Sequence, residues 1–156
     1  MLSFFVTNKY GDYNSLSQVI DRYLKPADNF LQLGCGNSEL ATQLYDNGFH
    51  QIHSIDVEPS VISMQTRKNK ERPGMSFSVG DASNLEMADG AHTVIIDKGT
   101  LDALLPPSAS DADKATVTRM FDEVHRVLAS GGRYIIVTLA QPHITEYWID
   151  HFFPLL

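Results

Sequence analysis

Cysteine and long apolar runs are scarce in this sequence. It has 156 residues and a single cysteine, Cys35, so an intramolecular disulfide is excluded. No apolar run reaches the roughly 20 residues that span a bilayer, and the hydrophobic start over residues 1–6 lacks the basic leader and cleavage site of a signal peptide. We therefore expect a chain that does not enter a membrane, and the low cysteine content fits a reducing, cytoplasmic compartment.

Basic charge is scarce as well. The sequence has 12 Lys and Arg against 19 Asp and Glu, a formal net charge of −7. An acidic surface repels phosphate backbones, which argues against a nucleic-acid partner. It favours a cationic partner such as a lysine-rich protein surface, although many proteins are acidic for solubility alone. The six histidines show no metal-ligand spacing with Cys, Asp or Glu, so we expect no bound metal.

The sequence does have a regular alternation of short apolar runs and amphipathic stretches, and its length fits one domain over residues 1–156. The apolar runs predict strands over residues 30–33, 52–55, 75–79, 92–96 and 133–139. The helical patterns predict helices over residues 14–24, 38–48, 60–70, 110–130 and 143–152. The helix over 110–130 would start at Ser110-Asp111-Ala112-Asp113, which resembles a capping box with Asp in place of Glu, and would end at Gly131-Gly132. This order predicts an α/β fold with a Rossmann-like, doubly wound, mostly parallel sheet and helices on both faces.

Special residues follow four successive predicted strands. Gly34-Cys35-Gly36 comes after the first, Asp56 ends the second, Gly80-Asp81-Ala82 follows the third and Asp97 ends the fourth. Ligands of such sheets bind outside the carboxyl ends of the strands. The pattern therefore predicts a ligand site at this edge, although the glycine turn alone would also fit a tight strand-to-helix connection without a ligand.

The spacing of these residues predicts a nucleoside ligand. Asp56 lies 20 residues after Gly36, where nucleoside-binding folds place a carboxylate on two ribose hydroxyls; the alternative is a helix-capping aspartate. A nicotinamide site usually has a third glycine where this chain has Glu39, whose charge would repel a pyrophosphate. S-adenosylmethionine has no phosphate and carries a cationic sulfur, so it fits this acidic turn better than a nicotinamide cofactor does. Asp81 and Ala82 would then hold adenine, unless Asp81 is a plain loop residue.

The fourth strand end would face the transferred methyl group. Its sequence, residues 97–104, is not the Asn-Pro-Pro-aromatic motif of methyltransferases that act on nucleobases or glutamine. Asp97 is the candidate for orienting an acceptor amine, with a helix cap as an equal alternative. Lys98 would contact the cofactor or carry surface charge. Cys35 lies in the glycine turn, where we expect it to be a small packed side chain and not a nucleophile.

Three strings of this chain resemble the eukaryotic methyltransferase-like protein 13 family, over residues 10–151. They are Leu33-Gly34-Cys35-Gly36-Asn37-Ser38-Glu39-Leu40, Ile55-Asp56 and Asp97-Lys98-Gly99-Thr100-Leu101-Asp102-Ala103-Leu104. The resemblance implies a protein methyltransferase that uses S-adenosylmethionine to modify lysine or the N-terminus of translation elongation factor 1-alpha. The implied cofactor contacts are Gly34, Asp56, Val57, Asp81, Ala82 and Lys98. With the glycine turn and the fourth strand end, the candidate set also includes Cys35, Gly36, Asn37 and Asp97.

The resemblance also sets an expectation for the end of the sheet. A methyltransferase fold of this class normally adds a sixth and a seventh strand, and the predicted elements stop after the fifth strand and one helix. We therefore expect a truncated sheet with an exposed edge.

Two alternatives to an active protein-lysine methyltransferase stay open. One is a non-catalytic cofactor-binding or interaction module, and the other is a nicotinamide-dependent oxidoreductase with a degenerate glycine motif.

Overall fold

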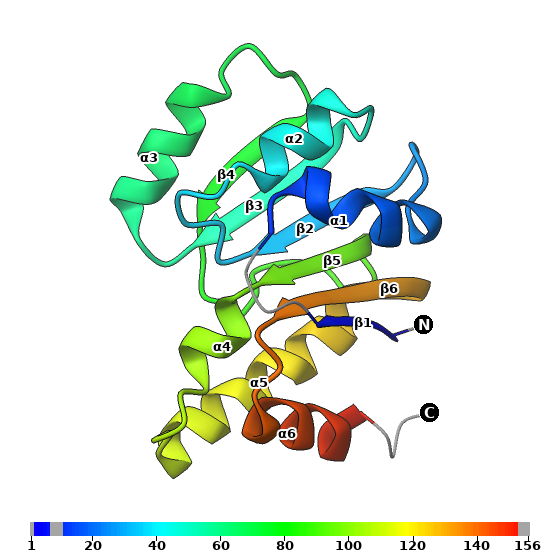
Figure 1. The fold of residues 1–156 in the computed structure, drawn as a ribbon. Helices are drawn as coiled ribbons and strands as arrows, with labels where there is room; N and C mark the ends of the chain where they lie inside the picture. The colour runs from blue at the N-terminus through cyan, green and yellow to red at the C-terminus, as the bar shows by residue number, and fades with distance from the viewer. Residues whose placement is uncertain (1, 7–10, 153–156) are drawn as a thin grey trace.

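A single parallel sheet organises the chain. The computed structural model describes the backbone of residues 2–6 and all of residues 11–152, and within them the strand order is β1-β6-β5-β2-β3-β4 (Figure 1). Every pair of neighbouring strands is parallel. The predicted parallel α/β fold is confirmed. The strands are β1 (Leu2–Val6), β2 (Asn29–Leu33), β3 (Gln51–Asp56), β4 (Met75–Val79), β5 (His92–Lys98) and β6 (Leu128–Thr138).

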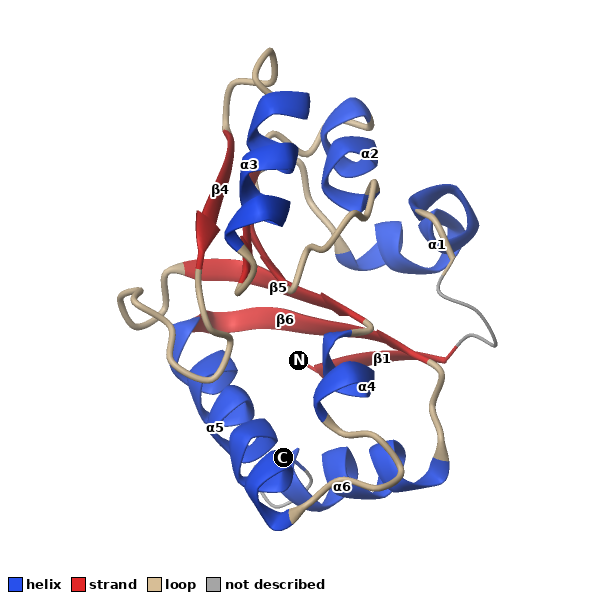
Figure 2. Ribbon diagram, turned by 90° about the vertical axis from the view of Figure 1, so that its left-hand side faces the viewer, coloured by secondary structure: helices blue, strands red, loops and turns tan. Residues whose placement is uncertain are grey.

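Helices cover both faces of the sheet (Figure 2). On one face lie α1 (Tyr13–Ile20), α2 (Leu40–Asp46) and α3 (Pro59–Lys68), and on the other lie α5 (Asp111–Val127) and α6 (Pro142–Phe152). The short helix α4 (Thr100–Leu104) stands at the carboxyl ends of the strands. In the described part of the chain, no helix combines the length and apolarity that a membrane span requires.

Alternation along the strands divides the core into two layers. In β2, Phe30 packs in the cluster that contains α1 and α2, whereas Leu31 and Leu33 pack in the cluster that contains α5. Successive side chains of a strand point to opposite faces, so a strand buried on both sides reads as a continuous apolar run. This is why Phe30 and Leu31 are adjacent apolar residues, and the polar Gln32 is also buried, where it accepts a hydrogen bond from the Ser54 hydroxyl.

The predicted start of the long helix is confirmed, but its predicted end is wrong. Ser110 and Asp113 form a capping box at the start of α5. The helix ends at Val127, and the glycine pair 131–132 lies inside β6 rather than at the helix end. Leu128 already pairs with His92 of β5, and the register between the two strands shifts before Arg133 pairs with Val94. Strand pairing therefore ends the helix before the glycines do.

The edge of the sheet beyond β6 also differs from expectation. The sequence predicts five strands and an exposed edge there, but β1 pairs in parallel with β6, from Leu2 opposite Tyr134 to Val6 opposite Thr138. The sheet in the described residues thus has six strands. A five-residue apolar segment is too short for its periodicity to reveal a strand, and its partner lies more than 100 residues away in the sequence.

The winding of the sheet fixes where a ligand can bind. The chain moves outward from β2 through β3 to β4, then returns to place β5 on the other side of β2. In open parallel sheets, a crevice forms at this reversal, outside the carboxyl ends of the strands. The ends of β2 and β5 therefore border the expected ligand site.

Candidate active site

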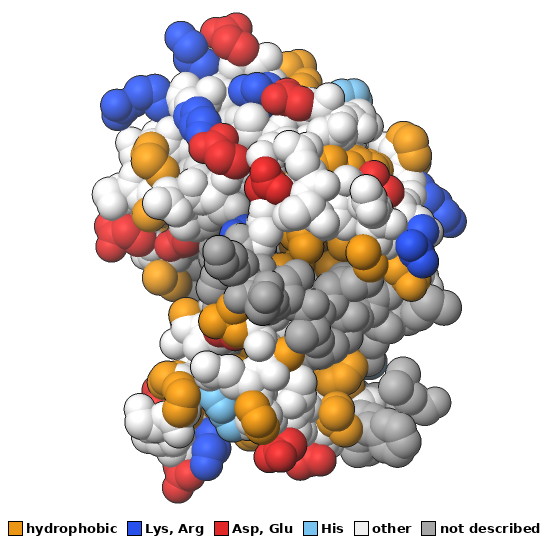
Figure 3. All heavy atoms as spheres, viewed as in Figure 1, with side chains coloured by type: hydrophobic (Ala, Val, Ile, Leu, Met, Phe, Trp, Pro, Cys, Tyr) orange, Lys and Arg blue, Asp and Glu red, His pale blue; other side chains and the backbone are white. Residues whose placement is uncertain are grey.

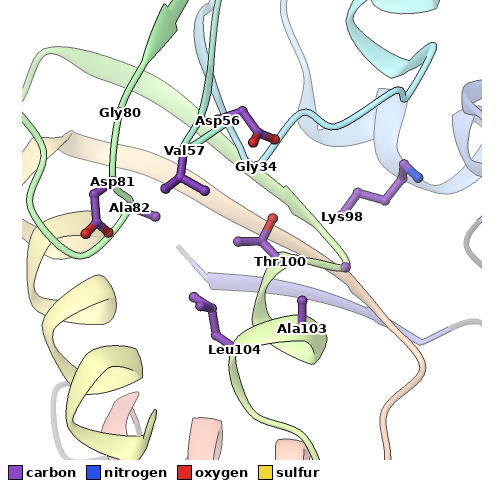
Figure 4. A pocket seen from close by; sticks show the side chains of 11 residues that line it. Gly34, Asp56, Val57, Gly80, Asp81, Ala82, Lys98, Thr100, Ala103 and Leu104 are labelled. Atoms are coloured by element: carbon purple, nitrogen blue, oxygen red, sulfur yellow. The ribbon is translucent and has the colours of Figure 1, made fainter. Parts of the chain in front are cut away.

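A cavity of about 290 Å³ opens at the carboxyl ends of β2, β3, β4 and β5 (Figure 4). Its wall combines strand ends with the helix α4, and most of its exposed surface is apolar. It is the size of a small-molecule site. Its lining residues are Gly34, Asp56, Val57, Gly80, Asp81, Ala82, Lys98, Gly99, Thr100, Ala103 and Leu104.

Gly34 makes the floor of the cavity possible. Its φ is +58°, and a Cβ atom added there would lie 2.2 Å from Oγ1 of Thr100. That hydroxyl donates a 2.8 Å hydrogen bond to the carbonyl of Leu33 and so ties α4 to the end of β2. A side chain at position 34 would require both a strained backbone and a displaced helix.

Asp56 is held at the rim by the backbone of two loops. Its Oδ2 accepts a hydrogen bond from the Gly36 N–H at 2.8 Å, and its Oδ1 accepts one from the Glu58 N–H at 3.0 Å. A carboxylate has about four lone-pair positions, so it can accept further bonds from two hydroxyl groups. The backbone bonds orient the carboxylate. Asp56 does not cap α3, because Glu58 is the N-cap residue and its side chain accepts the Ser60 N–H.

The outer part of the cavity is apolar. The side chain of Val57 is 67% exposed and Ala82 is buried, while Leu104 lies across from them on α4 (Figure 4). An exposed valine beside a cavity gives an apolar platform for a flat ring. Asp81 lies at the rim, and its carboxylate accepts bonds from the backbone and hydroxyl of Ser83.

A second cavity, of about 320 Å³, meets the first at Lys98. Asp12, which caps α1, and Glu39, which forms an ion pair with Lys68, contribute carboxylates to it. Partial burial lowers the pKa of Lys98. The negative charge of Glu39, which would repel a phosphate, is partly neutralised by its ion pair with Lys68. The remaining lining residues are Gly11, Ser38, Leu40 and Gln43.

Three members of the predicted glycine turn lie outside both cavities. Cys35 is buried, and burial raises the pKa of its thiol to about 12, which fits packing and not nucleophilic chemistry. The carbonyl of Gly36 accepts a bond from Gln65, and Asn37 is exposed. None of the three lines either cavity, so the cofactor contact predicted for this turn stays a prediction.

Asp97 also lies outside the cavity. It is 0% exposed, and its carboxylate accepts bonds from the N–H groups of Thr100 at 2.8 Å and Leu101 at 3.1 Å and from the Tyr134 hydroxyl at 3.3 Å. Burial raises the pKa of Asp97 to about 7, and the nearby Asp102 contributes in the same direction. In this geometry Asp97 caps α4, as the helix-cap alternative predicts, and the role of orienting an acceptor amine stays a prediction.

The burial of Asp97 predicts a pH-dependent stability. Its folded-state pKa lies above the ordinary value of 3.8, so the contribution of Asp97 to the free energy of unfolding should fall as pH rises from about 4 to about 7 and then level off. The lowered pKa values of His53, His92 and His151 act in the opposite direction over part of this range, so the difference between wild type and Asp97→Asn isolates the contribution of Asp97. Asp97→Asn removes the loss caused by Asp97. At about 1.4 kcal/mol for each pKa unit, the variant should gain up to about 4 kcal/mol on the wild type above pH 7. Urea unfolding from pH 4 to 8 measures this, and parallel curves for both proteins would contradict it.

Four residues of the cavity wall were not predicted from the sequence: Gly99, Thr100, Ala103 and Leu104. All four belong to the string over residues 97–104, whose resemblance carried the family prediction. Helical spacing within that string places Thr100, Ala103 and Leu104 on one face, and this was the available signal.

The titratable side chains of the described residues decide whether a metal could bind, and the distribution of charge can be followed on one face of the molecule. Among the described residues, no group of three or more His, Cys, Asp or Glu could hold a metal ion. On the face in Figure 3, the Lys and Arg side chains at the upper end alternate with Asp and Glu. The absence of a nucleic-acid partner stays a prediction from net charge.

Comparison with known proteins now gives the family. Residues 24–151 match a family model described as a methyltransferase domain. The chain belongs to the methyltransferase domain family. Its predicted resemblance is confirmed as well: this methyltransferase domain is 49% identical over 144 residues to the eEF1A lysine and N-terminal methyltransferase of Danio rerio and 44% identical over 147 residues to that of Homo sapiens. Both matches cover 92% of the domain and 20% of the relative, so the chain spans about a fifth of their length.

Solved structures agree with the fold of this methyltransferase domain. The PH0226 protein of Pyrococcus horikoshii has a TM-score of 0.66 at 26% identity, over 81% of the domain and 56% of that chain. A structure from Methanosarcina mazei, described as a SAM-dependent methyltransferase, has a TM-score of 0.60 at 25% identity, over 70% of the domain and 51% of that chain. The Rossmann-like prediction is therefore confirmed, and the predicted cofactor is the one in that description.

Proposed function

We propose that this methyltransferase domain binds S-adenosylmethionine and transfers its methyl group to a lysine of translation elongation factor 1-alpha. The observation that carries the proposal is the cavity at the strand reversal, which brings Gly34, Asp56 and Val57 together at the place where a nucleoside-binding sheet holds its ligand. The family match and the names of the relatives support the same reading.

The residues of the two cavities fit the parts of the cofactor. Asp56 would accept bonds from the ribose hydroxyls, while Val57, Ala82 and Leu104 would pack on adenine. The amino-acid end carries a carboxylate and an ammonium group, which fit the opposite charges of Lys98 and Asp12 in the second cavity. When bound, the cofactor supplies a methyl group activated by its positively charged sulfur.

The domain itself then mainly orients the acceptor and excludes water. Orientation of two reactants can contribute roughly 7–11 kcal/mol to a lowered barrier. A lysine acceptor must first lose a proton, because an amine with a pKa of about 10.4 is charged at neutral pH. The acidic character of the domain, −7 overall, would favour a basic protein acceptor, and that acceptor places the reaction in the cytoplasm.

The test has two stages, binding and transfer. S-adenosylhomocysteine at 100 times its Kd should add about 2.7 kcal/mol of stability, which corresponds to about 5–10 °C in Tm for a domain of this size. The same concentration of NAD should leave Tm unchanged. Transfer of labelled methyl to recombinant elongation factor 1-alpha then tests catalysis, with an acceptor whose lysines are changed to arginine as control.

The outcomes of the two stages separate the alternatives. Stabilisation by NAD instead of S-adenosylhomocysteine would favour the oxidoreductase. Binding of S-adenosylhomocysteine without transfer would leave a cofactor-binding module. Transfer to the control acceptor at the same rate would contradict lysine as the modified residue.

A further inference from the structure

The connection from β4 to β5 has no helix of its own. Residues 80–91 contain turns and one isolated bridge between Asp81 and Asn84, but neither a helix nor a strand. This connection starts in the wall of the cofactor cavity, which Gly80, Asp81 and Ala82 line. A segment without a helix or a strand ladder cannot pair all of its own backbone N–H and C=O groups, so another element must supply partners.

Arg126 of α5 supplies several of these partners. Its Nη2 donates to the carbonyl of Leu85 at 2.8 Å, and its Nη1 donates to the carbonyl of Met87 at 2.7 Å and to the carboxylate of Asp89 at 2.8 Å. The Gly90 N–H donates to the carbonyl of Arg126 at 3.0 Å. A guanidinium group presents five donors in a fixed planar fork, so it can hold several oxygens at once. One residue of α5 thereby anchors four residues of the connection.

Glu123, one helical turn earlier on α5, completes the anchor. Its Oε2 accepts the Leu85 N–H at 2.6 Å, and its two oxygens accept Nε and Nη2 of Arg126 at 2.8 Å each. The hydrogen bond from Arg126 lowers the pKa of Glu123, so the carboxylate stays charged at neutral pH. Both backbone polar groups of Leu85 are therefore held by a single ion pair on α5.

Empty space lies on both sides of the start of the connection. Gly80 and Asp81 line the cofactor cavity and also a third cavity, of about 300 Å³, whose opposite wall includes His53. Packing holds the buried side chains of Ala82 and Leu85, but it does not fix Asp81 between two cavities. The position of Asp81 instead depends on the turn that follows it, where the Asn84 N–H donates to the Asp81 carbonyl at 3.0 Å.

We propose that Arg126 is a positioning residue for the adenine end of the cofactor site. This rests on the proposed function. Arg126 does not line the cavity, and it acts by anchoring Leu85 to α5, which holds the turn over residues 81–84 in place (Figure 4). The carboxylate of Asp81 then stays at the rim, where it accepts a hydrogen bond from the exocyclic amino group of adenine. Without the anchor, the turn moves toward the third cavity and Asp81 leaves the adenine.

Arg126→Lys tests the proposal in the whole chain. Lysine keeps the charge, but its single ammonium group cannot hold Glu123 and the carbonyls of Leu85 and Met87 together. We expect the Kd for S-adenosylhomocysteine to rise about 10-fold, within the range of coupling from positions that do not contact the ligand. Calorimetry measures the Kd. Arg119→Lys is the matched control and should bind as wild type does, because Arg119 is exposed on the same helix and its guanidinium donates to Thr116 of α5.

The preference for adenine separates positioning from simple stabilisation. S-inosylhomocysteine has a carbonyl in place of the amino group, so wild type should bind it about 10- to 100-fold more weakly than S-adenosylhomocysteine, the effect of one hydrogen bond to a charged group. In Arg126→Lys this ratio should fall to a few-fold, and Glu123→Gln should show a smaller fall. If Arg126 only stabilises the fold, its variant should have a lower Tm with an unchanged ratio. That result, or an equal fall in Arg119→Lys, would overturn the proposal.

Hydrogen–deuterium exchange without cofactor tests the anchor by itself. The amide hydrogens of Ser83, Asn84 and Leu85 should exchange faster in Arg126→Lys than in wild type, while those of β5 should not change. Equal exchange in both proteins would show that Arg126 does not hold the turn and would overturn the proposal. Faster exchange in the variant, with no binding of S-adenosylhomocysteine to wild type, would reject the proposed function and the adenine role and leave only the anchor.

Discussion

Replacement of Asp56 by alanine should abolish binding of S-adenosylhomocysteine while the domain stays folded. The carboxylate is the group expected to hold both ribose hydroxyls, and hydrogen bonds to a charged group contribute about 1.5–3 kcal/mol each. Loss of both would weaken binding by more than about 100-fold. Calorimetry gives the affinity, and circular dichroism confirms the fold.

Asp56 also has a structural role, so the design needs a second variant. Its oxygens accept bonds from the Gly36 and Glu58 N–H groups, which alanine removes. Asp56→Asn keeps one oxygen for the loop and should retain more stability but still lose most of the affinity. Asp150→Asn, which changes an exposed carboxylate on α6, controls for the change in net charge. Wild-type affinity in both Asp56 variants would show that the ribose assignment is wrong.

The second large effect is expected from Gly34→Ala. An alanine at φ +58° costs about 1–2 kcal/mol in backbone strain, and its Cβ would meet Oγ1 of Thr100 at 2.2 Å. Moving Thr100 also breaks the bond to the Leu33 carbonyl and shifts α4. We expect a loss of about 3 kcal/mol or more, a fall in Tm of roughly 10 °C, and no measurable cofactor binding.

Two further variants separate the strain from the clash. Gly131 has a φ of +74° and no atom within 4 Å of an added Cβ, so Gly131→Ala should show the backbone cost alone. Adding Thr100→Ala to Gly34→Ala removes the closest contacts and should recover part of the lost stability. If Gly34→Ala and Gly131→Ala cost the same, the contact with Thr100 does not matter and the argument for a glycine floor fails.

Both predictions depend on the same wall of the cavity. Asp56 orients the turn that contains Gly36, and Gly34 allows α4 to approach β2. The buried Asp97 caps α4 from below, and Asp102 ties it to the segment after β6. Changes at Gly34, Asp97 and Asp102 therefore affect the same short helix through separate contacts, whereas a change at Asp56 affects the glycine turn. Cofactor affinity and the pH dependence of stability distinguish them.

The sequence by itself determined the layered parallel sheet, because local periodicity and turn residues specify each element without reference to distant ones. It also placed Gly34, Asp56, Asp81 and Ala82 at one edge, since the ends of parallel strands meet there whatever the side chains do. The capping box of Ser110 and Asp113 was readable for the same reason, as all its bonds lie within four residues.

Only the tertiary structure decided which strand-end side chains face the cavity. Asp97 and Asp56 each end a predicted strand, so they look alike in sequence. Packing under α4 buries Asp97 in the core, whereas Asp56 stays at the rim of the cavity. The pairing of β1 with β6 and the contact of Gly34 with Thr100 join residues more than 60 positions apart. Such contacts depend on the complete fold, because burial and direction of a side chain are set by whichever element packs against it.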